Sequence, residues 1–124
     1  MEKQEIVDGV IECVKESLVI EDQEITTNTK LIVDLGADSL DFLDIMFQLE
    51  EKFDITLDKE DFNFLKRIDL PEEEAISEGT LTQKALSKLK EYLPLLDENK
   101  SGITPADLKD YISVGSIVKL VGQC

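Results

Sequence analysis

A chain of 124 residues has room for one domain with a single modest core, and an enzyme with a deep substrate cleft would be unusual at this size. Its 28 acidic and 13 basic residues leave a net charge of −15, which argues against binding to nucleic acid or anionic membranes and favours basic protein partners. Because 42% of the residues are hydrophobic, the chain is expected to fold despite this charge.

No apolar run approaches the length of a membrane span, and the segment 1–5 lacks the basic and apolar regions of a signal peptide. We therefore expect a cytoplasmic protein that is not embedded in a membrane. The two cysteines, Cys13 and Cys124, have no metal-site spacing and make a poor disulfide framework. Both are expected to be reduced thiols, and no metal site is predicted.

The segment from Lys3 to about Leu18 is predicted to form an amphipathic helix, because its apolar residues recur at intervals of three and four. The following segment, 19–38, lacks this periodicity and is rich in turn-forming polar residues, so a long loop is expected. Four apolar residues of this loop could attach it to the core: Ile25, Leu31, Ile32 and Leu35.

A second helix is predicted from Ser39 to about Phe53, directly after the stretch Asp34-Leu35-Gly36-Ala37-Asp38. Gly36 can adopt a positive φ in a tight loop, and Ser39 occupies an N-cap or first-turn position between acidic residues. The chain contains no His, so a Ser-His-Asp hydrolase is excluded. An exposed serine without a base to activate it is better interpreted as an acceptor for a group that another enzyme attaches.

The second helix has two apolar faces when its side chains are placed about 100° apart. One face is assigned to the core: Phe42, Ile45, Met46, Leu49 and Phe53. The other combines Leu40, Leu43 and Phe47 with the acidic residues Asp41, Asp44, Glu50 and Glu51. Apolar residues ringed by carboxylates favour a docking surface. The alternative is that Leu43 and Phe47 are buried against a later segment, since periodicity cannot separate two apolar faces.

Several shorter elements are predicted in the second half of the chain. Asp58 is expected to cap a short helix over 58–65, and Pro71 suits a first helical position. Thr80 could cap a helix over 81–93 that ends before Pro94. Thr104 and Pro105 then form a helix start, and a last apolar helix is expected over 114–121.

The run Asp38-Ser39-Leu40 after Asp34-Leu35-Gly36, followed by an acidic amphipathic helix, resembles the phosphopantetheine attachment site of the acyl carrier proteins. The resemblance implies an all-α, acyl-carrier-protein-like helical bundle that is not an enzyme. It also implies that Ser39 carries 4′-phosphopantetheine derived from coenzyme A, that Asp38 and Leu40 frame its recognition, and that the terminal thiol holds acyl groups as thioesters.

The resemblance implies partners as well. A holo-acyl-carrier-protein synthase, which is a phosphopantetheinyl transferase, would load the serine, and acyl-processing enzymes and acyltransferases with basic patches would dock beside it. The residues expected to face these partners are Asp41, Leu43, Asp44, Phe47, Glu50 and Glu51. A monomer is expected.

The resemblance covers about residues 3–57 and 103–121, so the chain is interpreted as one acyl carrier domain, 1–124, with additional helices in an insertion at about 58–102. The insertion, together with Phe42 and Phe47, makes the chain similar to specialised bacterial carriers of very long acyl chains for lipid A, within fatty-acid and lipid biosynthesis. An aminoacyl or peptidyl carrier remains the alternative within the same class.

Two alternatives come from other classes. The run Asp97-Glu98-Asn99-Lys100-Ser101-Gly102 imitates the first half of an EF-hand calcium loop, although position 12 falls on Leu108 where a Glu is needed. A helical calcium-binding protein therefore stays open beside the simpler interpretation, a polar connector between helices. A helical interaction module without a prosthetic group is the other alternative, and it predicts that Ser39 stays unmodified.

Overall fold

The computed structural model describes residues 2–123 of the chain. The larger helices are α1 (Lys3–Leu18), α2 (Ser39–Phe53), α5 (Gln83–Leu89) and α6 (Val114–Gly122). Between them lie the 3₁₀ helices η1 (Lys59–Phe62) and η2 (Pro105–Tyr111), the one-turn helices α3 (Phe64–Arg67) and α4 (Glu72–Ala75), and a hairpin of β1 (Ile76–Ser77) and β2 (Thr80–Leu81). The predicted helical fold class is confirmed, although the sequence did not reveal the hairpin.

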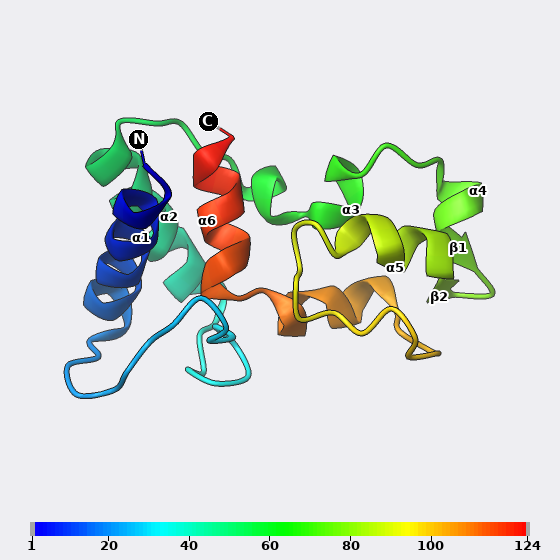
Figure 1. Ribbon diagram of the computed structural model, residues 1–124, viewed down its shortest axis with the longest axis horizontal. Coiled ribbons are helices and arrows are strands. Elements are labelled where there is room, and N and C mark those ends of the chain that lie inside the picture. Colours follow the sequence, from blue (N-terminus) through cyan, green and yellow to red (C-terminus); the bar gives the residue numbers. More distant parts are fainter. Residues whose placement is uncertain (1, 124) are drawn as a thin grey trace.

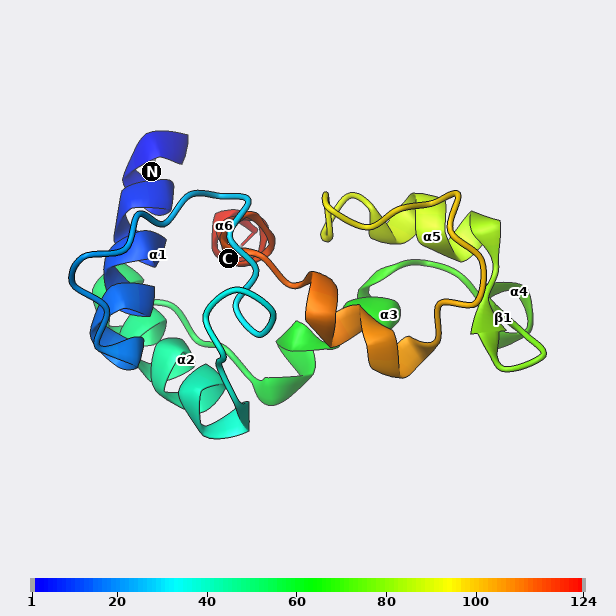
Figure 2. The same ribbon diagram turned by 90° about the horizontal axis from the view of Figure 1, so that it is seen from below.

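The elements are arranged in two lobes along the long axis of the molecule (Figure 1). The first lobe contains α1, α2, α6 and the loop 19–38, and the second contains α3, α4, the hairpin and α5. The view from below shows η1 between the lobes, whereas η2 lies in the second lobe, beside α3 (Figure 2). The chain therefore leaves the first lobe after α2, builds the second lobe, and returns through η2 to form α6.

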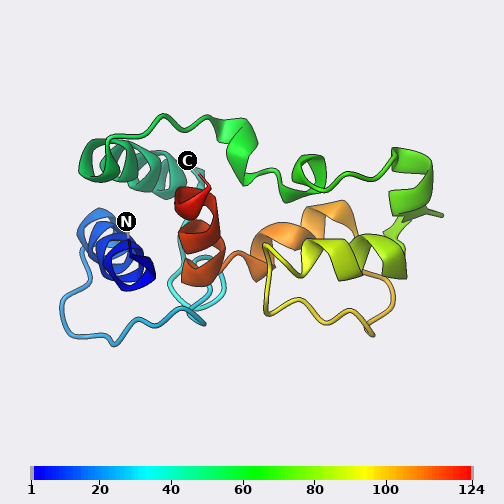
Figure 3. The ribbon, with the colours of Figure 1, turned by 45° about the horizontal axis from the view of Figure 1, so that its top comes forward.

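The first lobe is a bundle in which α1 packs against both α2 and α6 (Figure 3). Gly9 permits the close approach of α1 to α2, because a Cβ atom at this position would clash with Cζ of Phe53. An ion pair between Glu12 and Lys52, 3.0 Å apart, joins the exposed edges of the two helices. The predicted bounds of both helices agree with the structure.

The long loop 19–38 is held against the first turn of α6. The backbone N–H of Val114 donates to the carbonyl of Thr29 at 3.0 Å, and that of Gly115 donates to the carbonyl of Thr27 at 2.9 Å. These bonds satisfy two of the N–H groups that have no partner within a helix. Ile25 and Leu31 are buried and Ile32 and Leu35 half-buried, so the predicted attachment of the loop is confirmed.

The second lobe differs from the sequence-based prediction at its main helix. Thr80 lies in β2, and the residue that caps α5 is Thr82, whose hydroxyl accepts from the N–H of Ala85 at 3.2 Å. The helix ends at Leu89, before Pro94 can stop it, yet Leu93 is fully buried in the turns that follow. The prediction was wrong because the buried turns continue the apolar spacing of the helix.

The hairpin that precedes α5 is closed by a two-residue turn. Glu78 and Gly79 both have positive φ, 53° and 81°, as a type I′ turn requires. Elsewhere in this half of the chain the predicted caps are mostly right. Asp58 caps η1 and Thr104 caps η2, whereas Pro71 precedes α4 as its N-cap residue instead of occupying its first position.

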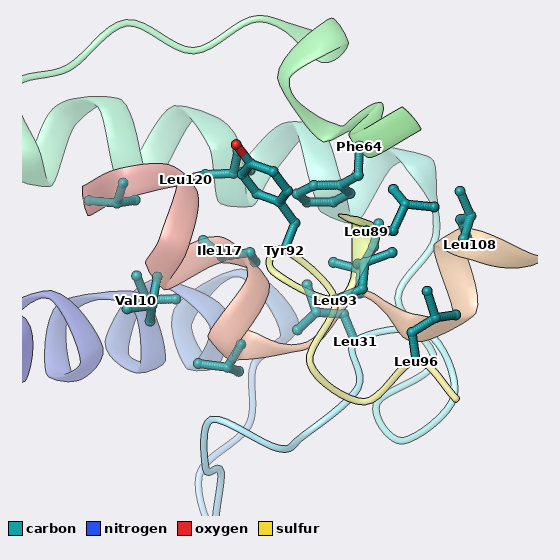
Figure 4. Packing of buried hydrophobic residues seen from close by; sticks show 14 of the residues in the cluster. Val10, Leu31, Phe64, Leu89, Tyr92, Leu93, Leu96, Leu108, Ile117 and Leu120 are labelled. Atoms are coloured by element: carbon teal, nitrogen blue, oxygen red, sulfur yellow. The ribbon is translucent and has the colours of Figure 1, made fainter. Parts of the chain in front are cut away.

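One hydrophobic core runs through both lobes. Figure 4 shows the rings of Phe64 and Tyr92 beside each other at the junction, with Leu120 of α6 on one side and Leu89 of α5 on the other. The two ring centroids are 5.7 Å apart. The second lobe is therefore packed onto the bundle rather than connected to it by the chain alone.

Arg67 provides the polar part of this junction. Its guanidinium pairs with Asp61 at 3.1 Å and donates to Oε1 of Gln123, beyond the end of α6, at 2.7 Å. It also lies 5.5 Å from the centre of the Tyr92 ring, and Gln123 in turn donates to the Tyr92 hydroxyl at 3.2 Å. Arg67 thus connects η1, the second lobe and the C-terminal end of α6.

Candidate functional site

Ser39 is the first residue of α2, directly after the N-cap residue Asp38. The Asp38 carboxylate accepts from the N–H of Asp41 at 3.0 Å, and the Asp41 carboxylate accepts from the N–H of Asp38 at 2.9 Å. This reciprocal capping box fixes the first turn of the helix. Ser39 itself is exposed, and its hydroxyl has no hydrogen-bond partner within residues 2–123.

The loop before Ser39 explains this exposure. Gly36 has a φ of +71°, which confirms the expected positive angle, and its N–H donates to the carbonyl of Ile32 at 3.0 Å. The next residue, Ala37, is buried and donates to the carbonyl of Leu31 at 3.0 Å. The chain is therefore anchored two residues before Ser39, so that the serine is held in place while its hydroxyl faces solvent.

A groove of about 680 Å³ opens beside Ser39. Phe42, Leu43 and Met46 of α2 form one part of its lining, and Phe62 of η1, whose ring meets that of Phe42 edge-on at 5.8 Å, forms another. Lys109 of η2 and Ile112 complete the wall that lies towards the second lobe. Sequence reasoning missed Phe62, Lys109 and Ile112, because no local pattern connects them to Ser39.

The expected docking face of α2 is only partly exposed. Leu40, Asp44, Phe47 and Glu51 are all exposed, and at 100° per residue they fall in one stripe about 60° wide. The exposed fractions of the two apolar members, Leu40 and Phe47, are 72% and 62%. These four residues are called the α2 stripe below.

The other predicted partner-facing residues have different surroundings. Leu43 is half-buried and lines the groove, whereas Phe47 is exposed, so Leu43 lacks the full exposure that was expected of the docking face. Glu50 is half-buried, and its carboxylate accepts from the N–H of Leu57 at 3.3 Å. Asp41 is also half-buried and belongs to the capping box.

The segment that imitates a calcium loop forms a turn in which the N–H of Lys100 donates to the carbonyl of Asp97 at 3.1 Å. The Asp97 carboxylate accepts from the N–H of Asn99 at 3.0 Å, and the Glu98 carboxylate accepts from the hydroxyl of Ser87 at 3.0 Å. Leu108, at the position where an EF-hand needs a Glu, is buried. Within the part of the chain that the structure describes, no group of three His, Cys, Asp or Glu residues could hold a metal ion.

Cys13 is buried in the face of α1 that packs on the core, and this burial raises the pKa of its thiol to about 11. It is a free cysteine, as expected, whereas Cys124 lies outside the described residues. No helix among residues 2–123 has the length and apolar character needed to cross a membrane.

Comparison with known proteins assigns this region of the chain to one family. A family model described as the phosphopantetheine attachment site matches residues 8–68, which contain Ser39 and end just after α3. The acyl carrier protein of Campylobacter lari is 39% identical over 64 residues, which make up 52% of this chain and 83% of that protein.

Further relatives give the same result. The acyl carrier protein of an Exiguobacterium species is 44% identical over 61 residues, or 49% of this chain and 77% of that protein. The chloroplastic acyl carrier protein 5 of Arabidopsis thaliana is 49% identical over 59 residues, or 47% of this chain and 42% of that protein. No solved structure matches the chain.

Proposed function

The chain belongs to the acyl carrier protein family, and from this premise we propose that Ser39 is the residue that carries its phosphopantetheine group. The observation that carries the proposal is the exposed Ser39 hydroxyl, which has no hydrogen-bond partner among residues 2–123 and is held at the first turn of α2 beside the groove. The residues present fit the group, because the hydroxyl is accessible to a transferase and the groove has space for a long, flexible chain.

The chemistry of such a carrier is simple. The family's prosthetic group is joined covalently and supplies a terminal thiol, which holds acyl groups as thioesters. The protein's own residues act as a scaffold instead of a catalyst. The capping box of Asp38 and Asp41 fixes the serine, and the N-terminus of α2 offers the positive end of the helix dipole to a phosphate attached there.

Loading of the serine can be measured directly. Incubation with coenzyme A and a phosphopantetheinyl transferase should add the mass of one phosphopantetheine to the intact wild-type protein, and Ser39→Ala should gain none. Ser77→Ala, at an exposed serine of the second lobe, is the matched control and should be loaded normally. Loading of Ser39→Ala to the wild-type extent would show that another residue is the acceptor, and an unmodified wild type would support an interaction module without a prosthetic group.

We further propose that the α2 stripe is the docking surface for the transferase and for acyl-processing enzymes. Two exposed carboxylates, Asp44 and Glu51, flank the exposed Phe47, and the chain as a whole carries a net charge of −15. Basic patches on partner enzymes would meet such a face with complementary charge, which speeds encounter and improves orientation. Leu40 and Asp38 lie closest to the serine in sequence and would frame its recognition.

Charge reversal tests this surface. The double variant Asp44→Lys/Glu51→Lys should raise the transferase KM by about 10-fold at low salt, and the difference should shrink as added salt screens exposed charges. Glu72→Lys/Glu73→Lys, which reverses two exposed acids of the second lobe, is the matched control and should have little effect. Equal KM values for the two double variants at low salt would contradict the assignment.

The cargo is proposed to be an acyl group of fatty-acid or lipid biosynthesis. The groove beside Ser39, in which Phe42 and Phe62 meet edge-on, supports a long apolar cargo, and within this class we favour the carriers of very long chains for lipid A. We also propose that residues 58–102 are an insertion in a single carrier domain, because α6 returns to pack on α1. The mass of the intact thioester, isolated from the native cell, would test the cargo, and an aminoacyl thioester would contradict it.

The remaining expectations stay predictions. The protein is proposed to act as a monomer in the cytoplasm, which sedimentation of the purified protein and fractionation of native cells would test.

A further inference from the structure

Lys109 brings a positive charge from the second lobe to the groove beside Ser39. It lies in the last turn of η2, far from Ser39 in the sequence, yet both residues line the same groove. Among the described residues that form this lining, Lys109 is the one that carries a positive charge, and Asp38 is the one that carries a negative charge. The remainder of the lining is apolar apart from Ser39.

The charge of Lys109 is available for a ligand. Its side chain is exposed, and within residues 2–123 its ammonium group forms no ion pair or hydrogen bond. Other basic residues near the junction of the lobes are already paired: Lys119 with Glu91 at 3.1 Å and Arg67 with Asp61 at 3.1 Å. Lys109 is therefore a basic residue beside the candidate attachment site whose charge is not used within the described fold.

An anion attached at Ser39 would need such a charge. A phosphodiester on the serine hydroxyl is negatively charged and would lie next to the carboxylates of Asp38 and Asp41, which form the capping box. The positive end of the α2 dipole offsets part of this repulsion. A lysine ammonium within reach would add a charge-assisted hydrogen bond and would offset more of it.

We propose that Lys109 is a positioning residue that binds the phosphodiester joined to Ser39. This inference rests on the proposed attachment at Ser39. The contact draws the first atoms of the attached arm towards η2, over the apolar lining formed by Phe42, Phe62 and Ile112. The second lobe thereby contributes directly to the carrier site, by setting the direction in which the arm leaves the serine.

The test compares the unloaded and loaded forms of four proteins: the wild type, Lys109→Gln, Lys109→Arg and Lys88→Gln. Lys88 is the matched control, because it is also exposed, lies in the last turn of a helix, and forms no ion pair among the described residues. Complete loading is first checked by intact mass. The melting temperature of each form is then measured by circular dichroism at low and at high salt.

Loading should raise the melting temperature of the wild type by about 2 °C more than that of Lys109→Gln, as expected for one exposed ion pair in a domain of this size. Lys109→Arg should restore the difference, Lys88→Gln should behave as the wild type, and high salt should remove the effect. In parallel, the ³¹P chemical shift of the attached phosphodiester should change in Lys109→Gln and stay unchanged in Lys88→Gln.

The outcomes separate this inference from the proposal on which it rests. If the wild type takes up no phosphopantetheine at Ser39, the attachment proposal fails. If all four proteins are loaded, but the melting shift and the ³¹P signal of Lys109→Gln equal those of Lys88→Gln, the role of Lys109 is overturned while the attachment stands.

Discussion

The junction between the lobes depends on Arg67, and the variant Arg67→Ala tests how much it contributes to stability. The guanidinium makes three kinds of contact: an ion pair with Asp61, a hydrogen bond to Gln123 at 2.7 Å and a cation–π contact with Tyr92. The side chains of the ion pair are 25% and 32% exposed, so solvent weakens it to about 0.5–1 kcal/mol.

The hydrogen bond to Gln123 and the contact with Tyr92 add to the stabilisation by Arg67. The charge-assisted hydrogen bond adds about 1 kcal/mol and the contact with the ring about 0.5–1 kcal/mol. Nε of Arg67 is buried and has no hydrogen-bond partner in the described part of the chain, which offsets part of this gain. We therefore expect Arg67→Ala to lower the free energy of unfolding by about 2 kcal/mol, a substantial share of the stability of a small domain.

Urea denaturation followed by circular dichroism measures this change as a fall of about 1 M in the midpoint. The matched control is Lys66→Ala, since the neighbouring ion pair between Lys66 and Glu60 is 65% and 64% exposed and should contribute less than 0.5 kcal/mol. Arg67→Lys should be nearly as unstable as Arg67→Ala, because an ammonium cannot make the same forked contacts. Equal midpoints for Arg67→Ala and Lys66→Ala would refute the reasoning.

Three further predictions concern the core and the loop before the site. Leu93→Ala should destabilise the protein by about 2–5 kcal/mol in urea, because the side chain is fully buried, and a loss below 1 kcal/mol would contradict this burial. Gly36→Ala should lower the free energy of unfolding by about 1 kcal/mol, because φ at this position is +71°, and not because of a clash. Gly36→Asn should recover part of this loss. Equal stability of Gly36→Ala and the wild type would contradict the argument. The neutral thiol of Cys13, whose pKa burial raises from 9.0 to about 11, stabilises the fold below pH 9. This contribution is lost as pH rises towards 11, so the free energy of unfolding should fall less steeply with alkaline pH in Cys13→Ala than in the wild type. Parallel curves of unfolding free energy against pH for the two proteins would contradict the assignment.

The first half of the fold could be predicted because its signals are local. Apolar spacing identified α1 and α2, and the sequence around Gly36 and Asp38 indicated both the turn and the start of the helix. The second half was less accessible. The hairpin has a Glu-Gly turn, whereas the pairs that announce a type I′ turn are Asn-Gly and Asp-Gly.

The site was predicted only as far as its residues are neighbours in the chain. Ser39, the capping residues and the α2 stripe lie in α2 or directly before it, and periodicity places the residues of the stripe on one side of the helix. Whether Leu43 belonged to the exposed face depended on η1 and η2, because Phe62 and Lys109 line the same groove as Leu43 in the folded protein. Lys109 could not be assigned at all, because only the return of the chain through η2 brings it to the groove.

Because α6 follows the second lobe in the chain, the first lobe can be completed only after the second lobe has been synthesised. Domains begin to fold during synthesis, at about 5–20 residues per second, so α6 leaves the ribosome roughly 4–14 s after α2. Until then the faces of α1 and the loop that α6 will cover stay open, and Val114 and Gly115 cannot donate to Thr29 and Thr27. We expect a nascent chain arrested before residue 114 to be cut by protease within α1, and the released chain to resist.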